Sequence, residues 1–86
     1  MSIPRKRKFY VADNDNAWDE SKPVQPAIVF AVAEWDAART FAADQDSKDG
    51  RIRSERIVMV SSDKTTIVTF SVRGQISPEM YDATEV

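Results

Sequence analysis

The chain alternates between apolar and polar residues in a way that predicts strands at two places in its first half. Residues 8–12 (KFYVA) put Phe9 and Val11 on one face of a strand and Tyr10 on the other. Residues 27–33 (AIVFAVA) form an almost continuous apolar run, which is typical of a central strand buried on both faces. We therefore expect the second strand to lie inside a sheet.

Two further strands are predicted in the second half of the chain. Residues 57–60 are apolar, and residues 66–73 alternate between the two faces of a half-buried strand. The connection between them, residues 61–65, is short and polar, so these strands should pair as an antiparallel hairpin. Gly74 ends the alternation, and Pro78 keeps the tail from extending a central strand.

One helix is predicted over residues 34–45, where alanine is dense and helix propensity is high. Its apolar side chains recur at helical spacing and form a stripe for packing on a sheet: Trp35, Ala38, Phe41 and Ala42. We expect Trp35 to be part of the core. The polar run 46–50 should end the helix, with Gly50 as the turn residue.

These elements predict the α+β class in the order β-β-α-β-β: a single antiparallel-type sheet of about four strands with one helix packed on one face. We interpret residues 1–86 as a single small domain, with a basic N-terminal segment at 1–7 and a C-terminal tail at 77–86. A chain of this length buries only about 60–65% of its unfolded surface, so the core should be thin.

The net charge of −2 conceals a separation of charge along the chain. Residues 1–12 carry a net +4, residues 13–50 a net −6, residues 51–73 a net +3 and residues 74–86 a net −3. Such blocks are typical of a small protein that meets a charged partner, because they steer encounter and suppress wrong pairings. The alternative interpretation is that the charges only keep the protein soluble.

The residue types that carry most enzyme chemistry are missing, since the chain has no histidine and no cysteine. This removes the commonest general base, the usual thiolate nucleophile and the main ligands of zinc and copper. The acidic residues at 44–55 do not match a calcium loop, because Lys48 stands at a ligand position. We therefore expect a protein that is not an enzyme and that holds no metal or cofactor.

A long polar connection, residues 13–26, joins the first two strands and is the first candidate binding site. Trp18 lies among acidic residues there, and tryptophan is a favoured anchor of protein interfaces. Trp18 could equally fold back and cap the small core, and both interpretations stay open at this point. The candidate partner-binding residues are Asp13, Asp15, Trp18, Asp19 and Glu20.

The second candidate is a nucleic-acid interface, because clustered basic side chains are suited to contacting phosphates. The run 5–8 is the strongest local charge signal, and residues 51 and 53 would share one face of an extended segment. The candidate residues are Arg5, Lys6, Arg7, Lys8, Arg51, Arg53 and Arg56. The alternative is a solvated terminus and a charged edge strand that blocks aggregation.

The overall plan resembles that of small α/β proteins encoded by phages and other mobile elements, anti-CRISPR proteins among them. The resemblance is architectural: a short basic start, a strand, a second strand running directly into VAEWDAARTFAA, a hairpin, and the tail VRGQISPEMYDATEV. It implies an inhibitor that binds a host protein or nucleoprotein complex stoichiometrically, without a cofactor. No functional residue of that family maps onto a position of this chain.

Our first functional hypothesis is a non-enzymatic protein-binding module, and the second is a small nucleic-acid-binding module. The protein would be a monomer, or a homodimer formed by edge-strand pairing. No apolar run approaches the roughly 20 residues needed to cross a bilayer, so no membrane is expected. The start lacks the apolar region of a secretory signal, and a cytoplasmic location is the expectation.

Overall fold

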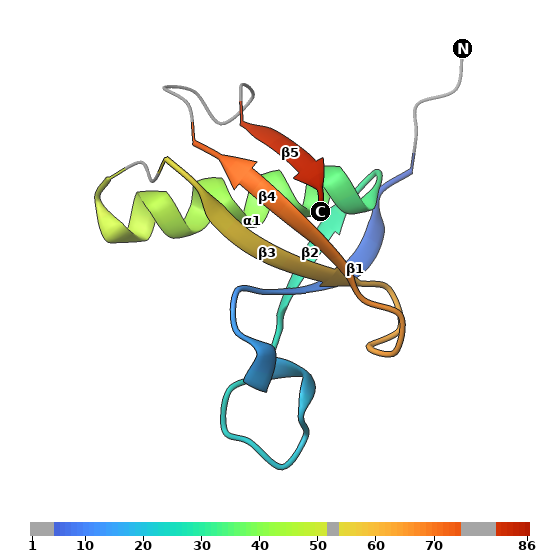
Figure 1. Cartoon of the computed structure of the whole chain (residues 1–86). Coiled ribbons are helices and arrows are strands. Elements are labelled where there is room, and N and C mark those ends of the chain that lie inside the picture. The colour runs from blue at the N-terminus through green and yellow to red at the C-terminus, as the bar shows by residue number, and fades with distance from the viewer. Residues whose placement is uncertain (1–4, 52–53, 75–80) are drawn as a thin grey trace.

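The computed structural model describes residues 5–51, 54–74 and 81–86. Its elements are β1 (Arg7–Ala12), η1 (a 3₁₀ turn, Asp15–Trp18), β2 (Ala27–Ala31), α1 (Glu34–Asp49), β3 (Arg56–Ser61), β4 (Val68–Arg73) and β5 (Asp82–Glu85). These strands form one antiparallel sheet in the order β2-β1-β3-β4-β5, and α1 lies across one face of it (Figure 1). The predicted α+β class is confirmed.

The sheet is built from hairpins and one pairing between distant segments. The predicted hairpin of the second half is confirmed as β3–β4, whose last strand begins at Val68 rather than at residue 66. The central pairing of β1 with β3 joins the two halves of the chain. It has three register pairs, which are Tyr10–Ser61, Val11–Val60 and Ala12–Met59.

The prediction that residues 27–33 form a central strand is wrong, because β2 is an edge strand of the sheet. Ala31 is fully buried and Val29 packs against the core, whereas Ile28 and Phe30 are exposed on the opposite face. Buried and exposed side chains therefore alternate along β2, although every residue of the strand is apolar. A continuous apolar run has the same pattern whether its second face is buried or open to solvent.

The tail adds a fifth strand to the sheet of about four that was predicted. Residues 82–85 pair with β4 as β5, in the register of Arg73 with Asp82 and Phe70 with Glu85. Pro78 lies outside the described residues. A short strand of sequence DATE has no apolar alternation, so nothing in its pattern distinguishes it from a polar tail.

The helix α1 runs to Asp49, one turn beyond the predicted end. Gly50 ends it, as predicted, in a left-handed conformation with φ of 76°, and its backbone N–H donates to the carbonyl oxygen of Asp46. Only glycine adopts this conformation without steric cost. The run 46–49 is helical because Asp46 faces the sheet and forms buried contacts there.

The core lies between α1 and the sheet, and small helix side chains let the two layers approach closely. Its buried members include Phe9, Val11, Ala31, Ala37, Ala38, Phe41, Ala42, Val58, Val60, Phe70, Val72 and Tyr81. The prediction that Trp35 is a core residue is wrong, because its side chain is 46% exposed. Trp35 lies at the margin of the buried stripe, where the guanidinium of Arg39 stacks 4.9 Å from the ring centroid.

Candidate binding surface

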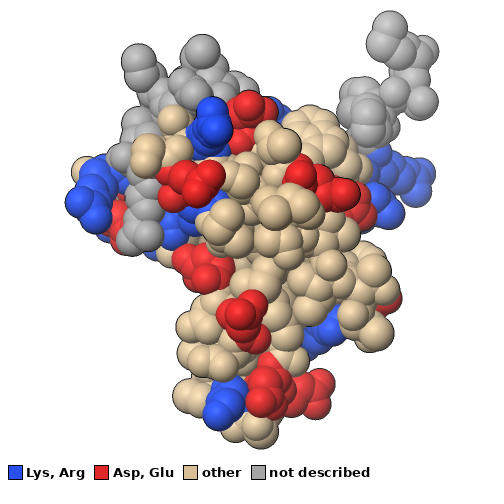
Figure 2. Space-filling view, viewed as in Figure 1, with Lys and Arg blue, Asp and Glu red and all other residues tan. Residues whose placement is uncertain are grey.

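The two faces of the sheet differ sharply in what covers them. One face carries α1, and the strand residues beneath it are buried and, apart from Arg56, apolar. The other face, turned toward the viewer in Figure 2, is exposed at Ile28, Phe30 and Ile57 and buried at Ala12, Met59 and Ser61. On it Phe30 stands opposite Lys8, and Ile28 stands opposite the half-buried Tyr10.

The outer edge of β2 is the least protected part of this sheet. No strand of the described residues pairs with its outer side, so half of its backbone N–H and C=O groups point away from β1. Its sequence, AIVFA, has no charge, proline or glycine. Ile28 is 57% exposed and Phe30 is 61% exposed beside these free backbone groups. Native edge strands are normally protected by the features that β2 lacks.

The end of β2 near Ala31 is basic. Arg7 of β1 stands opposite Ala31 in the register, and the exposed residues 5–8 all carry positive charge there. The Nη2 atom of Arg7 lies 3.9 Å from Oε1 of Glu34, a long ion pair between exposed groups. Nearer the other end, the Nζ atoms of Lys8 and Lys64 lie 5.3 and 4.8 Å from the centroid of the Tyr10 ring, which stands opposite Ile28.

The other end of β2 is acidic, because the loop of residues 13–26 begins there. This loop has four acidic side chains and one lysine, and it projects from the bottom of the sheet in Figure 1. In Figure 2 red side chains gather toward its tip, far from the blue ones around the start of β1. The edge strand therefore lies between a basic end and an acidic end.

Short hydrogen bonds between neighbouring residues hold the acidic loop. The Asn14 side chain caps η1 by accepting a hydrogen bond from the backbone N–H of Asn16. The carboxylate of Asp19 accepts hydrogen bonds from the hydroxyl and the backbone N–H of Ser21, at 2.7 and 3.0 Å. These bonds, the hydroxyl first, hold the pKa of Asp19 below its ordinary value.

The five predicted partner-binding residues are placed in different environments. Asp15 and Glu20 are exposed, and Asp19 is exposed but bonded to Ser21. Asp13 pairs with a buried arginine of the sheet. Trp18 is half-buried, and its Nε1 atom is buried without a hydrogen-bond partner. The loop therefore presents the exposed side chains of Asp15 and Glu20 at its surface and keeps part of its tryptophan covered.

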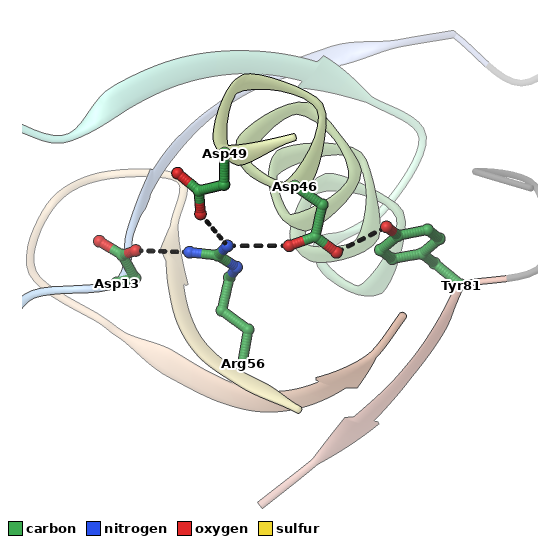
Figure 3. A network of polar contacts seen from close by, with 5 residues as sticks. All are labelled: Asp13, Asp46, Asp49, Arg56 and Tyr81. Atoms are coloured by element: carbon green, nitrogen blue, oxygen red, sulfur yellow. Dashed lines mark hydrogen bonds and ion pairs between the residues drawn. The ribbon is translucent and has the colours of Figure 1, made fainter. Parts of the chain in front are cut away.

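A buried network of polar side chains lies where the loop, the helix and the sheet meet (Figure 3). Arg56, at the start of β3, has a side chain that is only 6% exposed. Its Nη1 donates to Asp13 at 3.1 Å, and its Nη2 donates to Asp46 at 2.9 Å and to Asp49 at 3.2 Å. Tyr81, just before β5, donates its hydroxyl to Asp46 at 2.6 Å.

The network shifts the pKa values of two of its members. Burial lowers the pKa of Arg56, but hydrogen bonds with Asp46 and Asp49 outweigh it and leave the value above the ordinary one. Burial, followed by the hydrogen bond with Asp46, raises the pKa of Tyr81 to about 12. Both groups therefore keep their protons at neutral pH, and the network links four segments of the chain by charge-assisted hydrogen bonds.

The basic residues predicted to contact nucleic acid do not form one surface among the described residues. Arg56 is buried and held by three carboxylates, so the prediction that it lies on a phosphate-binding surface needs correction. Arg51 is exposed just beyond the far end of α1, whose 16 residues span about 24 Å. Arg53 lies outside the described residues. The remaining group is the run 5–8 at the start of β1.

Other chemistry has no support in the described part of the chain. It holds no group of three or more acidic residues placed to bind a metal ion. Neither of its helices has the length and apolar character of a membrane-spanning segment. Comparison with known proteins gives no match to a family model, to a curated protein or to a solved structure. The candidate site therefore rests on geometry and charge alone.

Sequence reasoning missed the exposure of Ile28 and Phe30, because it placed both inside the sheet. The sequence did contain one signal. The strand at residues 27–31 follows a long polar loop and runs directly into the helix, so the next segment of the chain is not a strand that could pair with its second edge. The buried network was also missed, since its members come from four separate segments.

Proposed function

We infer that this protein is a non-enzymatic protein-binding module, whose binding surface is the outer edge of β2 together with the exposed side chains of Ile28 and Phe30 on that strand. The observation that carries this proposal is an uncharged edge strand with two large exposed apolar side chains, Ile28 and Phe30. A partner contributes an extended segment that pairs with β2.

Strand addition explains both features of this edge. The free backbone groups of β2 supply hydrogen bonds to any extended chain, and the alternate side chains of the added strand meet Ile28 and Phe30. Full burial of one such side chain stabilises a complex by about 1.5–3 kcal/mol. Exposed apolar groups on a small monomer are otherwise a liability for solubility.

The acidic loop has a secondary part in this proposal. Asp13 and Asp19 are bonded within the protein, so the loop offers Asp15 and Glu20 as charges that border the site. Charges at the rim of an interface mainly steer association and select partners. Inhibition of a nucleoprotein complex, which the resemblance to anti-CRISPR proteins implies, stays a prediction.

Nucleic-acid binding is the second candidate, and it rests on the four exposed basic residues 5–8 beside Phe30 and Tyr10. Aromatic side chains on an open sheet face, flanked by cations, are suited to stacking the bases of a single strand. The acidic loop at the other end of β2 would repel a phosphate backbone. We therefore favour a protein partner.

The test is capture by tagged protein from a nuclease-treated lysate of cells that also express an untagged copy. The wild type is compared with Phe30→Lys and with Ile57→Lys, which adds the same charge at an exposed open-face position on β3. We expect one defined protein to be captured by the wild type and by Ile57→Lys and to be lost with Phe30→Lys.

The captured protein is then purified, and its affinity for the three variants is measured directly. Equal affinity for all three would contradict a site on β2. Binding that vanishes on nuclease treatment and falls steeply with salt would instead support the nucleic-acid candidate.

A further inference from the structure

We propose that the partner which occupies β2 is a second copy of this chain, bound through antiparallel β2–β2 pairing about a two-fold axis. This inference rests on the proposed function and names the partner of the same surface. Two five-stranded sheets would then form one continuous sheet with β2 of each copy at its centre.

The distribution of charge along β2 favours this arrangement. The basic residues 5–8 lie at the Ala31 end of the edge, and the acidic loop lies at the Ala27 end. An antiparallel neighbour is reversed, so the basic end of each copy meets the acidic end of the other. A two-fold axis produces this attraction twice in every dimer.

The side chains of β2 are also self-complementary. In the register centred on Val29, Ile28 stands opposite Phe30 of the partner subunit on the open face, and the reverse pair forms on the other side of the axis. Aromatic side chains opposite β-branched ones are favourable cross-strand pairs. The four exposed apolar side chains would thus cover one another.

The other edge pairings of two copies are less favourable. A parallel β2–β2 pairing would bring the two basic ends together and the two acidic ends together. Pairing of β5 with β5 would bring the like charges of Asp82 and Glu85 of the two copies opposite each other. Pairing of β2 with β5 joins unlike edges and would leave an open edge at each end of the assembly.

The proposed β2–β2 interface is small, so the dimer should be weak. Five strand residues from each copy bury less than the roughly 1,200 Å² of a stable standard interface. We therefore expect a reversible dimer with a dissociation constant on the order of micromolar or weaker. At low concentration the 9.7 kDa monomer should predominate.

The first experiment is sedimentation of the purified full chain from about 1 µM to about 1 mM, a range that spans the expected dissociation constant. We expect the wild type and Ile57→Lys to pass from one chain to two, and Phe30→Lys to stay monomeric. A wild type that is monomeric throughout overturns the inference. The proposed function would survive a monomeric wild type if the capture experiment recovers a host protein with the wild type and not with Phe30→Lys.

The second experiment reverses charge at the two ends of β2. At low salt, Lys8→Glu and Glu20→Lys should each weaken dimerisation about three- to tenfold, and the double variant should recover most of the loss, because every copy carries both changes. Lys48→Glu, at the far end of α1, is the control and should have no effect. Two results would contradict the antiparallel arrangement. One is that neither single reversal changes the dissociation constant of the dimer, and the other is that the double variant weakens dimerisation by the product of the two single fold-changes.

Discussion

The two edges of this sheet are built in opposite ways. The edge at β5 is short and polar, with Asp82 opposite Arg73 and Glu85 at its end. The edge at β2 has only apolar residues, and two of them are exposed. Charges at an edge strand prevent pairing with other chains, so the same sheet protects one edge and leaves the other open. This asymmetry is why we assign binding to β2.

The protected edge is also the one tied to the buried network. Tyr81, which immediately precedes β5, is bonded to Asp46 on α1, and Asp46 in turn holds Arg56 at the start of β3. Next to β2 the polar contacts are more local: Asp36 accepts hydrogen bonds from the N–H of Val32 and from the side chain of Arg39, both within four residues of it in the chain. We therefore expect the stability of the fold and the proposed binding to depend on different edges, which can be altered separately.

Breaking the network should have the largest effect. Asp46→Ala removes the carboxylate that pairs with both Arg56 and Tyr81, and it leaves a buried arginine with less compensation. We expect a loss of about 3–5 kcal/mol in the free energy of unfolding, measured by urea denaturation at fixed protein concentration. Asp44→Ala, which removes an exposed pair with Lys48 on the same helix, should change it by less than about 0.5 kcal/mol.

Alkaline pH should loosen the same edge without mutation. Because folding raises the pKa of Tyr81 from about 10 to about 12, its contribution to stability is complete below pH 10 and is lost as the pH rises to 12. The loss should reach about 2–3 kcal/mol by pH 12. Unfolding of the wild type and of Tyr81→Phe is compared across this range, since subtraction isolates the tyrosine. Parallel profiles would show that Tyr81 does not titrate differently in the two states.

Making β5 resemble β2 should create a second open edge. The double substitution Thr84→Phe and Glu85→Val gives β5 an exposed aromatic residue and removes its terminal charge. A molecule that can pair at both edges of its sheet forms open-ended chains of copies. We therefore expect light scattering to detect species larger than a dimer, with an association constant about tenfold higher than that of the wild type. Adding Phe30→Lys should reduce the size again, and its failure to do so would argue against a role for β2.

Removing the ion pair near β2 should have the smallest effect. Glu34→Gln eliminates the carboxylate that lies 3.9 Å from Arg7, and both side chains are exposed. We expect the free energy of unfolding to change by less than about 0.5 kcal/mol. A loss above 1 kcal/mol in thermal or urea unfolding would mean that the start of β1 depends on this pair more than its exposure implies.

The sequence predicted the elements whose pattern depends on neighbouring residues. The faces of β1 followed from a period of two, with Phe9 and Val11 buried and Tyr10 on the other side. The end of α1 followed from Gly50, although the helix continued to it without stopping at residue 45. In both cases the local chemistry leaves few alternatives.

The features that sequence reasoning missed depend on contacts between distant segments. Whether β2 is central or at an edge depends on which strands pair elsewhere, and its apolar run is compatible with both. Arg56 was taken for a surface charge because its partners Asp13, Asp46 and Asp49 are brought to it only by folding. Local sequence patterns therefore contain too little information to predict either the proposed binding surface or the buried network.

The central pairing of β1 with β3 has a consequence for how this protein folds. Every other pairing in the sheet joins strands that are neighbours in the chain, whereas this one joins its two halves through three residue pairs. Hairpins form from local contacts in microseconds, but a contact between distant segments must first close a long loop. We therefore expect the meeting of the two halves, in which α1 of the first half packs against strands of the second, to limit the rate of folding.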